Sequence, residues 1–141
     1  GKGVIIDPAL GGDITASETI AWSHDRDTPY VPSPVLHDGI LYMLKRNDGI
    51  LTALDAATGR IHYGPERLPG IDGAYASLVA AGDRIYVVGR NGTTVVLAAG
   101  PELKVIAESR LDDGFDASPA AAGRDLLLRG RSSLYCLTEQ P

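Results

Sequence analysis

The sequence predicts an all-β fold built from repeated four-stranded antiparallel sheets. Short strands rich in Val, Ile, Leu and Tyr alternate with glycine-containing turns, and the same order of strands and turns returns along the chain. No segment has apolar residues at helical spacing over three turns. The 141 residues, of which 44% are hydrophobic, suffice for one ordinary globular domain.

Three serines mark the repeat. Ser33, Ser77 and Ser118 lie 44 and 41 residues apart, and each precedes a short apolar strand, a turn with glycine and a second apolar strand. The third strands are "GILTALD" (49–55), "TTVVLA" (93–98) and "SSLYCL" (132–137), and fourth strands follow at "RIHYG" (60–64) and "LKVIAES" (103–109). Asn-Gly and Asp-Gly pairs in the connecting loops favour tight hairpins. A period of this length with four strands per unit is typical of a β-propeller blade.

The repeat divides the chain into four expected units. Residues 31–70 and 71–111 form complete blades, and 112–141 form a last blade without its fourth strand. Residues 1–30 form a partial blade, with "GVIID" (3–7) and "ETIAW" (18–22) as third and fourth strands. A closed ring takes about four to eight blades. We therefore expect the C-terminal part of a longer propeller, which is favoured because Gly1 opens almost directly on a strand, or a protomer that completes the ring as a homo-oligomer.

One segment carries a family resemblance. "TALDAATGRIHY" (52–63) resembles the Ala-x-Asp-x-x-Thr-Gly-x-x-x-Trp motif of the quinoprotein-like propellers, the pyrroloquinoline quinone (PQQ) repeat superfamily. Ala53, Asp55, Thr58 and Gly59 match, Tyr63 replaces the Trp, and the other repeats lack the full motif. We expect Asp55 to cap the turn between the third and fourth strands, because Asp readily hydrogen-bonds backbone groups two or three residues on.

The resemblance has functional implications. The Ser-Pro openings at 33–34 and 118–119 and the closing "SSLYCL" are similar to non-enzymatic members, such as the outer-membrane assembly propeller lipoproteins. This similarity implies a scaffold or binding module for a protein or cell-envelope partner, located in the periplasm or secreted, without a cofactor. The superfamily also includes PQQ-dependent dehydrogenases, which use an adjacent Cys pair and calcium ligands. Because Cys136 is the single cysteine of this sequence, the chain cannot supply the Cys pair. The alternative to a scaffold is therefore a fragment of such an enzyme whose active-site residues lie outside this chain.

Composition argues against other classes of protein. The net charge of -5 and the absence of a basic block argue against nucleic-acid binding. No apolar run approaches the roughly 18 residues of a membrane-spanning helix, and the N-terminus has no apolar core of a signal peptide. His24, His37 and His62 lack metal-ligand spacing, and no serine has a G-x-S-x-G frame. We therefore expect no catalytic or metal site.

The candidate binding residues lie on one predicted face. The entry to each first strand and the loop after each second strand emerge on the same side of a meander, because successive strands alternate in direction. The candidates are the aromatics before the first strands and the arginines after the second strands, namely Tyr30, Tyr75, Phe115, Arg46, Arg90 and Arg129. Aromatics beside arginines suit the binding of a peptide or an anionic small molecule. The simpler alternative is that the arginines pair with nearby aspartates and the aromatics fill gaps between blades.

Overall fold

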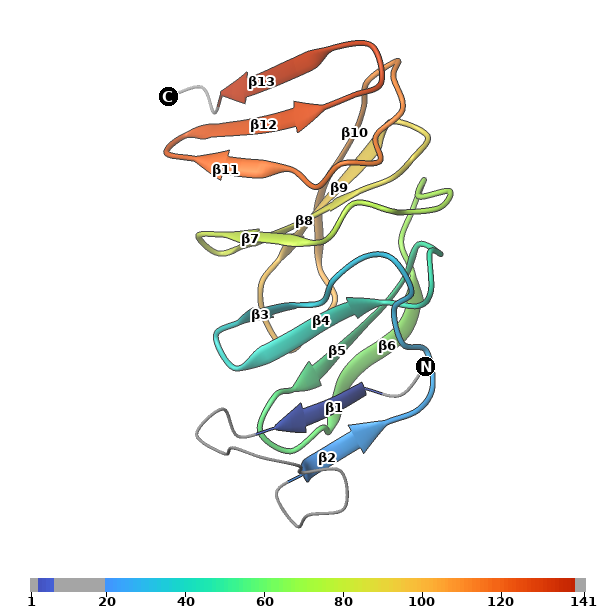
Figure 1. The fold of residues 1–141 in the computed structure, drawn as a ribbon. Coiled ribbons are helices and arrows are strands. Elements are labelled where there is room, and N and C mark those ends of the chain that lie inside the picture. Colours follow the sequence, from blue (N-terminus) through green and yellow to red (C-terminus); the bar gives the residue numbers. More distant parts are fainter. Residues whose placement is uncertain (1–2, 7–19, 139–141) are drawn as a thin grey trace.

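The computed structural model describes residues 3–6 and 20–138, and every regular element in these ranges is a β-strand. Asp7, Glu18 and Thr19, at the ends of the predicted N-terminal strands, lie outside the described residues. The strands, labelled in Figure 1, are β1 (Gly3–Ile6), β2 (Ile20–His24), β3 (Val35–His37), β4 (Ile40–Leu44), β5 (Ile50–Asp55), β6 (Ile61–Arg67), β7 (Val79–Ala81), β8 (Arg84–Val88), β9 (Thr93–Ala98), β10 (Val105–Arg110), β11 (Ala120–Ala122), β12 (Asp125–Arg129) and β13 (Leu134–Thr138). No described helix is long and apolar enough to cross a membrane.

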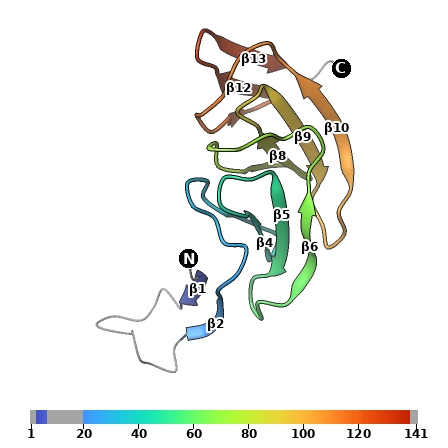
Figure 2. The ribbon, with the colours of Figure 1, turned by 90° about the vertical axis from the view of Figure 1, so that its right-hand side faces the viewer.

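The strands form separate antiparallel meanders in which chain neighbours pair. Two sheets have four strands, β3 to β6 and β7 to β10, one has β11 to β13, and β1 pairs with β2. We call β3 to β6 blade 1, β7 to β10 blade 2 and β11 to β13 blade 3. The sheets stand side by side along an open arc (Figure 1), and Figure 2 shows β6 and β10 along its outer, convex side. This arrangement confirms the predicted all-β architecture, in which four-stranded propeller blades form an incomplete ring.

Turn chemistry sets the hairpin between the two inner strands of blade 1. Asp38 and Gly39 both have positive φ, 46° and 76°, as a two-residue type I′ turn requires. In the outer hairpin, the Asp55 carboxylate accepts hydrogen bonds from the Thr58 backbone N–H at 2.8 Å and its hydroxyl at 2.7 Å. Gly59 follows at φ 72°. The predicted capping role of Asp55 is therefore confirmed.

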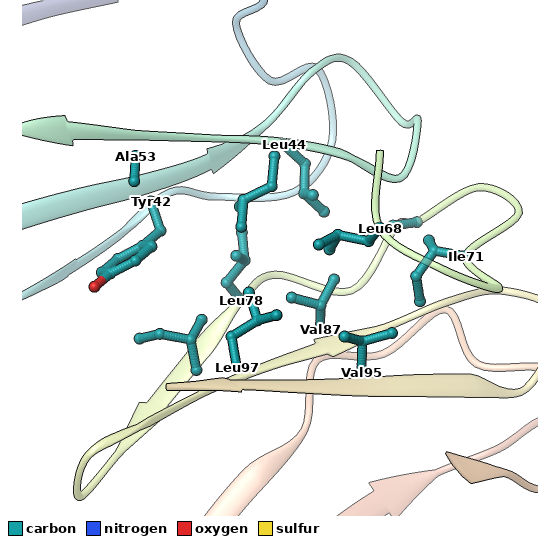
Figure 3. Packing of buried hydrophobic residues seen from close by; sticks show 12 residues of the cluster. Tyr42, Leu44, Ala53, Leu68, Ile71, Leu78, Val87, Val95 and Leu97 are labelled. Carbon is teal, nitrogen blue, oxygen red and sulfur yellow. The ribbon is translucent and has the colours of Figure 1, made fainter. Parts of the chain in front are cut away.

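The core lies between blades rather than within one sheet. Strands β4, β5, β8 and β9 are largely buried, because neighbouring sheets cover both of their faces. The cluster between blades 1 and 2, shown in Figure 3, contains Tyr42, Leu44, Leu51, Ala53, Leu68, Ile71, Ala74, Leu78, Ile85, Val87, Val95 and Leu97. A smaller cluster joins blades 2 and 3 and contains Ala76, Val88, Phe115, Leu126 and Leu128.

Polar contacts fix the spacing of the blades. The Ser33 N–H donates to the Ser77 hydroxyl oxygen at 2.9 Å, and the Ser77 N–H donates to the Ser118 hydroxyl oxygen at the same distance. The three serines aligned in the sequence thus form a hydrogen-bonded series from blade to blade. At the outer hairpins, the Trp22 indole N–H donates to the Ala56 carbonyl oxygen at 2.9 Å. The bond ties β2 to blade 1.

Candidate functional site

The same backbone hydrogen bond recurs on one face of each blade. An arginine N–H donates at 2.9 Å to a carbonyl oxygen in the loop that enters the first strand, from Arg46 to Thr28, Arg90 to Gly73 and Arg131 to Gly114. Two residues after each of these carbonyls stand Tyr30, Tyr75 and Asp116. We call the six side chains Tyr30, Arg46, Tyr75, Arg90, Asp116 and Arg131 the arginine face. The backbone therefore places the loops after the second strands beside the loops that enter the first strands.

Two sequence candidates lie elsewhere. Arg129 is an exposed residue at the end of β12, and Arg131 occupies the position equivalent to Arg46 and Arg90. Phe115 is completely buried, with its ring centroid 5.7 Å from that of Tyr135 in an edge-on arrangement. It fills the gap between blades 2 and 3, as the alternative interpretation of the aromatics expected.

Arg90 connects blades 2 and 3. Its guanidinium carbon lies 4.0 Å from the centre of the Tyr75 ring, within range of a cation–π contact. Its Nε donates to one Asp116 carboxylate oxygen at 2.6 Å, and the other oxygen faces a terminal guanidinium nitrogen of Arg131 at 3.3 Å. The hydrogen bond from Arg90 lowers the pKa of Asp116, and the same bond raises the pKa of Arg90. One carboxylate thus bridges two arginines from successive blades.

Arg46 differs from the other two arginines. Its side chain is exposed, and no ion pair to its guanidinium occurs among the described residues. It borders a hollow lined by Thr28, Pro29, Tyr30, Arg46, Asn47 and Asp48. Its backbone adopts φ 50°, in the left-handed region. Tyr30, whose N–H donates to the Arg46 carbonyl oxygen at 3.2 Å, has an 80% exposed side chain.

A network of donors around Asp113 braces the same face in blade 3. Its carboxylate accepts hydrogen bonds from the Ser132 hydroxyl at 2.7 Å, the Gly114 N–H at 2.7 Å and the Tyr135 hydroxyl at 3.2 Å. The Arg131 N–H at 3.2 Å also donates to it. Hydrogen bonds to the carboxylate lower the pKa of Asp113 to about 2, and the bond from the Ser132 hydroxyl makes the largest contribution. Asp113 therefore holds the backbone that presents Arg131.

The structure also places the other chemically capable residues. His24 ends β2, His37 ends β3 and His62 lies in β6, so the three histidines belong to different strands. Among the described residues no group of three or more His, Cys, Asp or Glu side chains is arranged to hold a metal ion. Cys136 is an exposed free thiol. Among the described side chains of the arginine face, Arg90 contacts Tyr75, and Asp116 joins Arg90 to Arg131.

Solved structures provide the comparison. BamB from Moraxella catarrhalis is similar over 85% of this chain at 23% identity and a TM-score of 0.68, and the chain spans 37% of the length of BamB. The computationally designed Ika4 protein is similar over 84% of this chain and 72% of its own, with 16% identity and a TM-score of 0.62. A europium-containing methanol dehydrogenase matches 74% of this chain and 21% of its own at 16% identity and a TM-score of 0.54.

At these identities the likeness concerns the fold. No known family pattern matches the sequence, and no curated protein does. BamB and the methanol dehydrogenase share the arrangement of the sheets with this chain. The chain therefore has the fold of an arc of a β-propeller.

Proposed function

We propose that this chain is a non-catalytic propeller scaffold that binds a protein partner through its arginine face, in an extracytoplasmic compartment. The observation that carries the proposal is the series of arginines, from Arg46 through Arg90 to Arg131, on one face of successive blades. Tyr and Arg are enriched at the energetic centres of protein interfaces, because each offers a large contact area together with hydrogen bonding. The compartment is proposed from the family resemblance.

The chemistry of the face supports binding rather than catalysis. Its groups that are charged at neutral pH are the arginines, which stay charged at all relevant pH, and Asp116, whose lowered pKa keeps it ionised. Neither type of group supplies the proton exchange near neutral pH that general acid–base catalysis needs. The side chains instead offer fixed positive charge and an exposed ring at Tyr30.

A library of random dodecapeptides displayed on phage tests this proposal. Peptides selected on the purified chain are labelled, and their dissociation constants are measured by fluorescence anisotropy for the wild type, Tyr30→Ala and Ile61→Ala. Tyr30 is 80% exposed on the arginine face, and Ile61, 44% exposed, begins β6 after the outer hairpin on the opposite side. We expect Tyr30→Ala to weaken binding about tenfold, as the loss of an interface aromatic does. Peptides insensitive to Tyr30→Ala but weakened by Ile61→Ala would refute the proposal.

The second candidate function is part of a PQQ-dependent dehydrogenase. The similarity of the fold to a methanol dehydrogenase and the motif at 52–63 favour it. Gel filtration of the chain after incubation with PQQ and calcium separates the two candidates. The scaffold proposal predicts that the quinone chromophore elutes apart from the protein, and its stoichiometric co-elution would favour the dehydrogenase.

A further inference from the structure

The contact between blades 2 and 3 holds a carboxylate between two arginines. The Asp116 carboxylate lies between Arg90 and Arg131, with one oxygen 2.6 Å from Arg90 Nε and the other 3.3 Å from a terminal nitrogen of Arg131. Charge-assisted hydrogen bonds of this kind are stronger than neutral ones. A carboxylate of the chain itself therefore pairs with arginines of two successive blades.

The equivalent position between blades 1 and 2 has no carboxylate. The residue at the place of Asp116 is Tyr75, whose ring is occupied by the Arg90 guanidinium at 4.0 Å. Of the acids that line hollows together with Arg46, Asp27 is paired with Lys45 at 2.8 Å, and neither Asp25 nor Asp48 forms an ion pair with Arg46. Within the described chain, Arg46 is thus the member of the arginine series without a carboxylate.

The backbone of Arg46 does not explain an arginine at this position. At φ 50° a residue with a Cβ costs roughly 1–2 kcal/mol, whereas glycine adopts this conformation without that cost. The side chain makes no hydrogen bond or ion pair that would offset the cost within the described residues. A conformationally unfavourable, uncompensated residue in a hollow indicates a role in binding.

An apolar surface lies beside the Arg46 charge. Tyr30 is 80% exposed and Val31 47% exposed, and the Val31 N–H donates to the Asn47 side-chain oxygen at 3.2 Å. This bond holds the entry loop against the loop that carries Arg46. The charged and apolar groups therefore lie on adjoining loops, which an extended peptide can contact together.

From this geometry we propose that Arg46 anchors an acidic side chain of an extended segment of a partner protein, and that an apolar neighbour of that acid packs on Tyr30 and Val31. The ligand carboxylate takes at Arg46 the role that Asp116 takes at Arg90. Aspartate or glutamate fits this site because its two oxygens match the donors of a guanidinium. This inference rests on the proposed function and specifies the chemistry of the partner.

The test is a double-mutant cycle between Arg46 and the peptide. The dodecapeptides selected on the wild-type chain are resynthesised with each Asp or Glu replaced in turn by Asn or Gln. Their dissociation constants are measured for the wild type, Arg46→Gln and Arg60→Gln. Arg60 is an exposed arginine in the outer hairpin on the opposite face, so Arg60→Gln makes the same change of charge away from the site. Circular dichroism and amide NMR spectra verify that each variant is folded.

We expect one acid in each peptide whose replacement weakens binding to the wild type about tenfold and to Arg46→Gln by less than about twofold. Arg60→Gln is expected to behave like the wild type. Equal losses of affinity in the wild type and in Arg46→Gln, or selected peptides without acids, would overturn the inference about Arg46. If these peptides still bind Tyr30→Ala more weakly, the proposed scaffold function stands. Peptides that bind Tyr30→Ala and Arg46→Gln as tightly as the wild type would instead overturn the proposed function itself.

Discussion

Replacing Phe115 distinguishes a structural aromatic from a binding one. Phe115 is completely buried and packs with Ala76, Val88 and Leu128 between blades 2 and 3. A Phe side chain buries roughly 150–250 Å², which at about 25 cal/mol per Å² gives an upper limit of about 4–6 kcal/mol. Phe→Ala substitutions in cores cost about 3–5 kcal/mol. We therefore expect Phe115→Ala to lower the free energy of unfolding by about 3–5 kcal/mol.

Urea denaturation followed by Trp22 fluorescence and by circular dichroism measures this loss. Two variants serve as controls: Phe115→Leu, which keeps most of the apolar volume, is expected to cost about 1–1.5 kcal/mol. Tyr30→Ala, which truncates a side chain that is 80% exposed, is expected to cost less than about 0.5 kcal/mol. A loss below about 1 kcal/mol for Phe115→Ala would refute the assignment of this residue to the core between blades.

Three further predictions concern residues of the blades and of the arginine face. Tyr42→Phe is expected to cost about 1–3 kcal/mol in thermal or urea unfolding, because the Tyr42 hydroxyl accepts from the Gly100 N–H at 2.8 Å and donates to its carbonyl oxygen at 3.3 Å; an unchanged stability would contradict this bond. The hydrogen bonds to Asp113 lower its pKa to about 2 from 3.8, so its contribution to the free energy of unfolding is present above about pH 4 and is lost as the pH falls toward 2. We expect Asp113→Asn to abolish the loss of stability between about pH 4 and 2 that this carboxylate causes, measured as the free energy of unfolding against pH. The same dependence on pH in the wild type and in Asp113→Asn would contradict this role. Arg46→Gly is expected to raise the free energy of unfolding by about 0.5–1 kcal/mol in urea titrations while it weakens the binding of acidic peptides, and a loss of stability would show that the arginine supports the fold.

The fold was predictable because the turns and strands recur along the sequence at nearly constant spacing. The aligned Ser33, Ser77 and Ser118 prove to be equivalent in space, joined by hydrogen bonds from blade to blade. The predicted fourth strand of blade 1 ended at Gly64, whereas β6 continues to Arg67. Pro65 is tolerated within β6, because this outer strand pairs with β5 on one side only.

The membership of the arginine face was only partly predictable. Arg46, Arg90 and Arg131 each follow the aligned serine by 13 residues, so strict use of the period identifies Arg131 in place of Arg129. The aromatics are harder to place, because the loop of blade 1 has one more residue between the bonded carbonyl and the serine. Because of that extra residue, Tyr30 and Tyr75 both lie two residues after the bonded carbonyl, whereas Phe115 lies one residue after it and matches neither tyrosine.

Backbone features that decide the chemistry of Arg46 lie beyond sequence patterns. Its positive φ depends on the hydrogen bond from its N–H to the Thr28 carbonyl oxygen and on the bond that its own carbonyl accepts from Tyr30. The missing ion pair depends on Lys45 engaging Asp27 at 2.8 Å. Neither contact follows from spacing or composition, since Asp25, Asp27 and Asp48 all lie in the loops around Arg46.

An amide NMR titration of the wild-type chain with its tightest selected peptide locates the binding surface residue by residue. We predict that the largest shifts occur at Tyr30, Arg46 and Asn47 and extend to Tyr75. Shifts concentrated at the hairpins of the opposite face, around Asp38–Gly39 or Gly59, with no change at Arg46, would contradict a partner site on the arginine face.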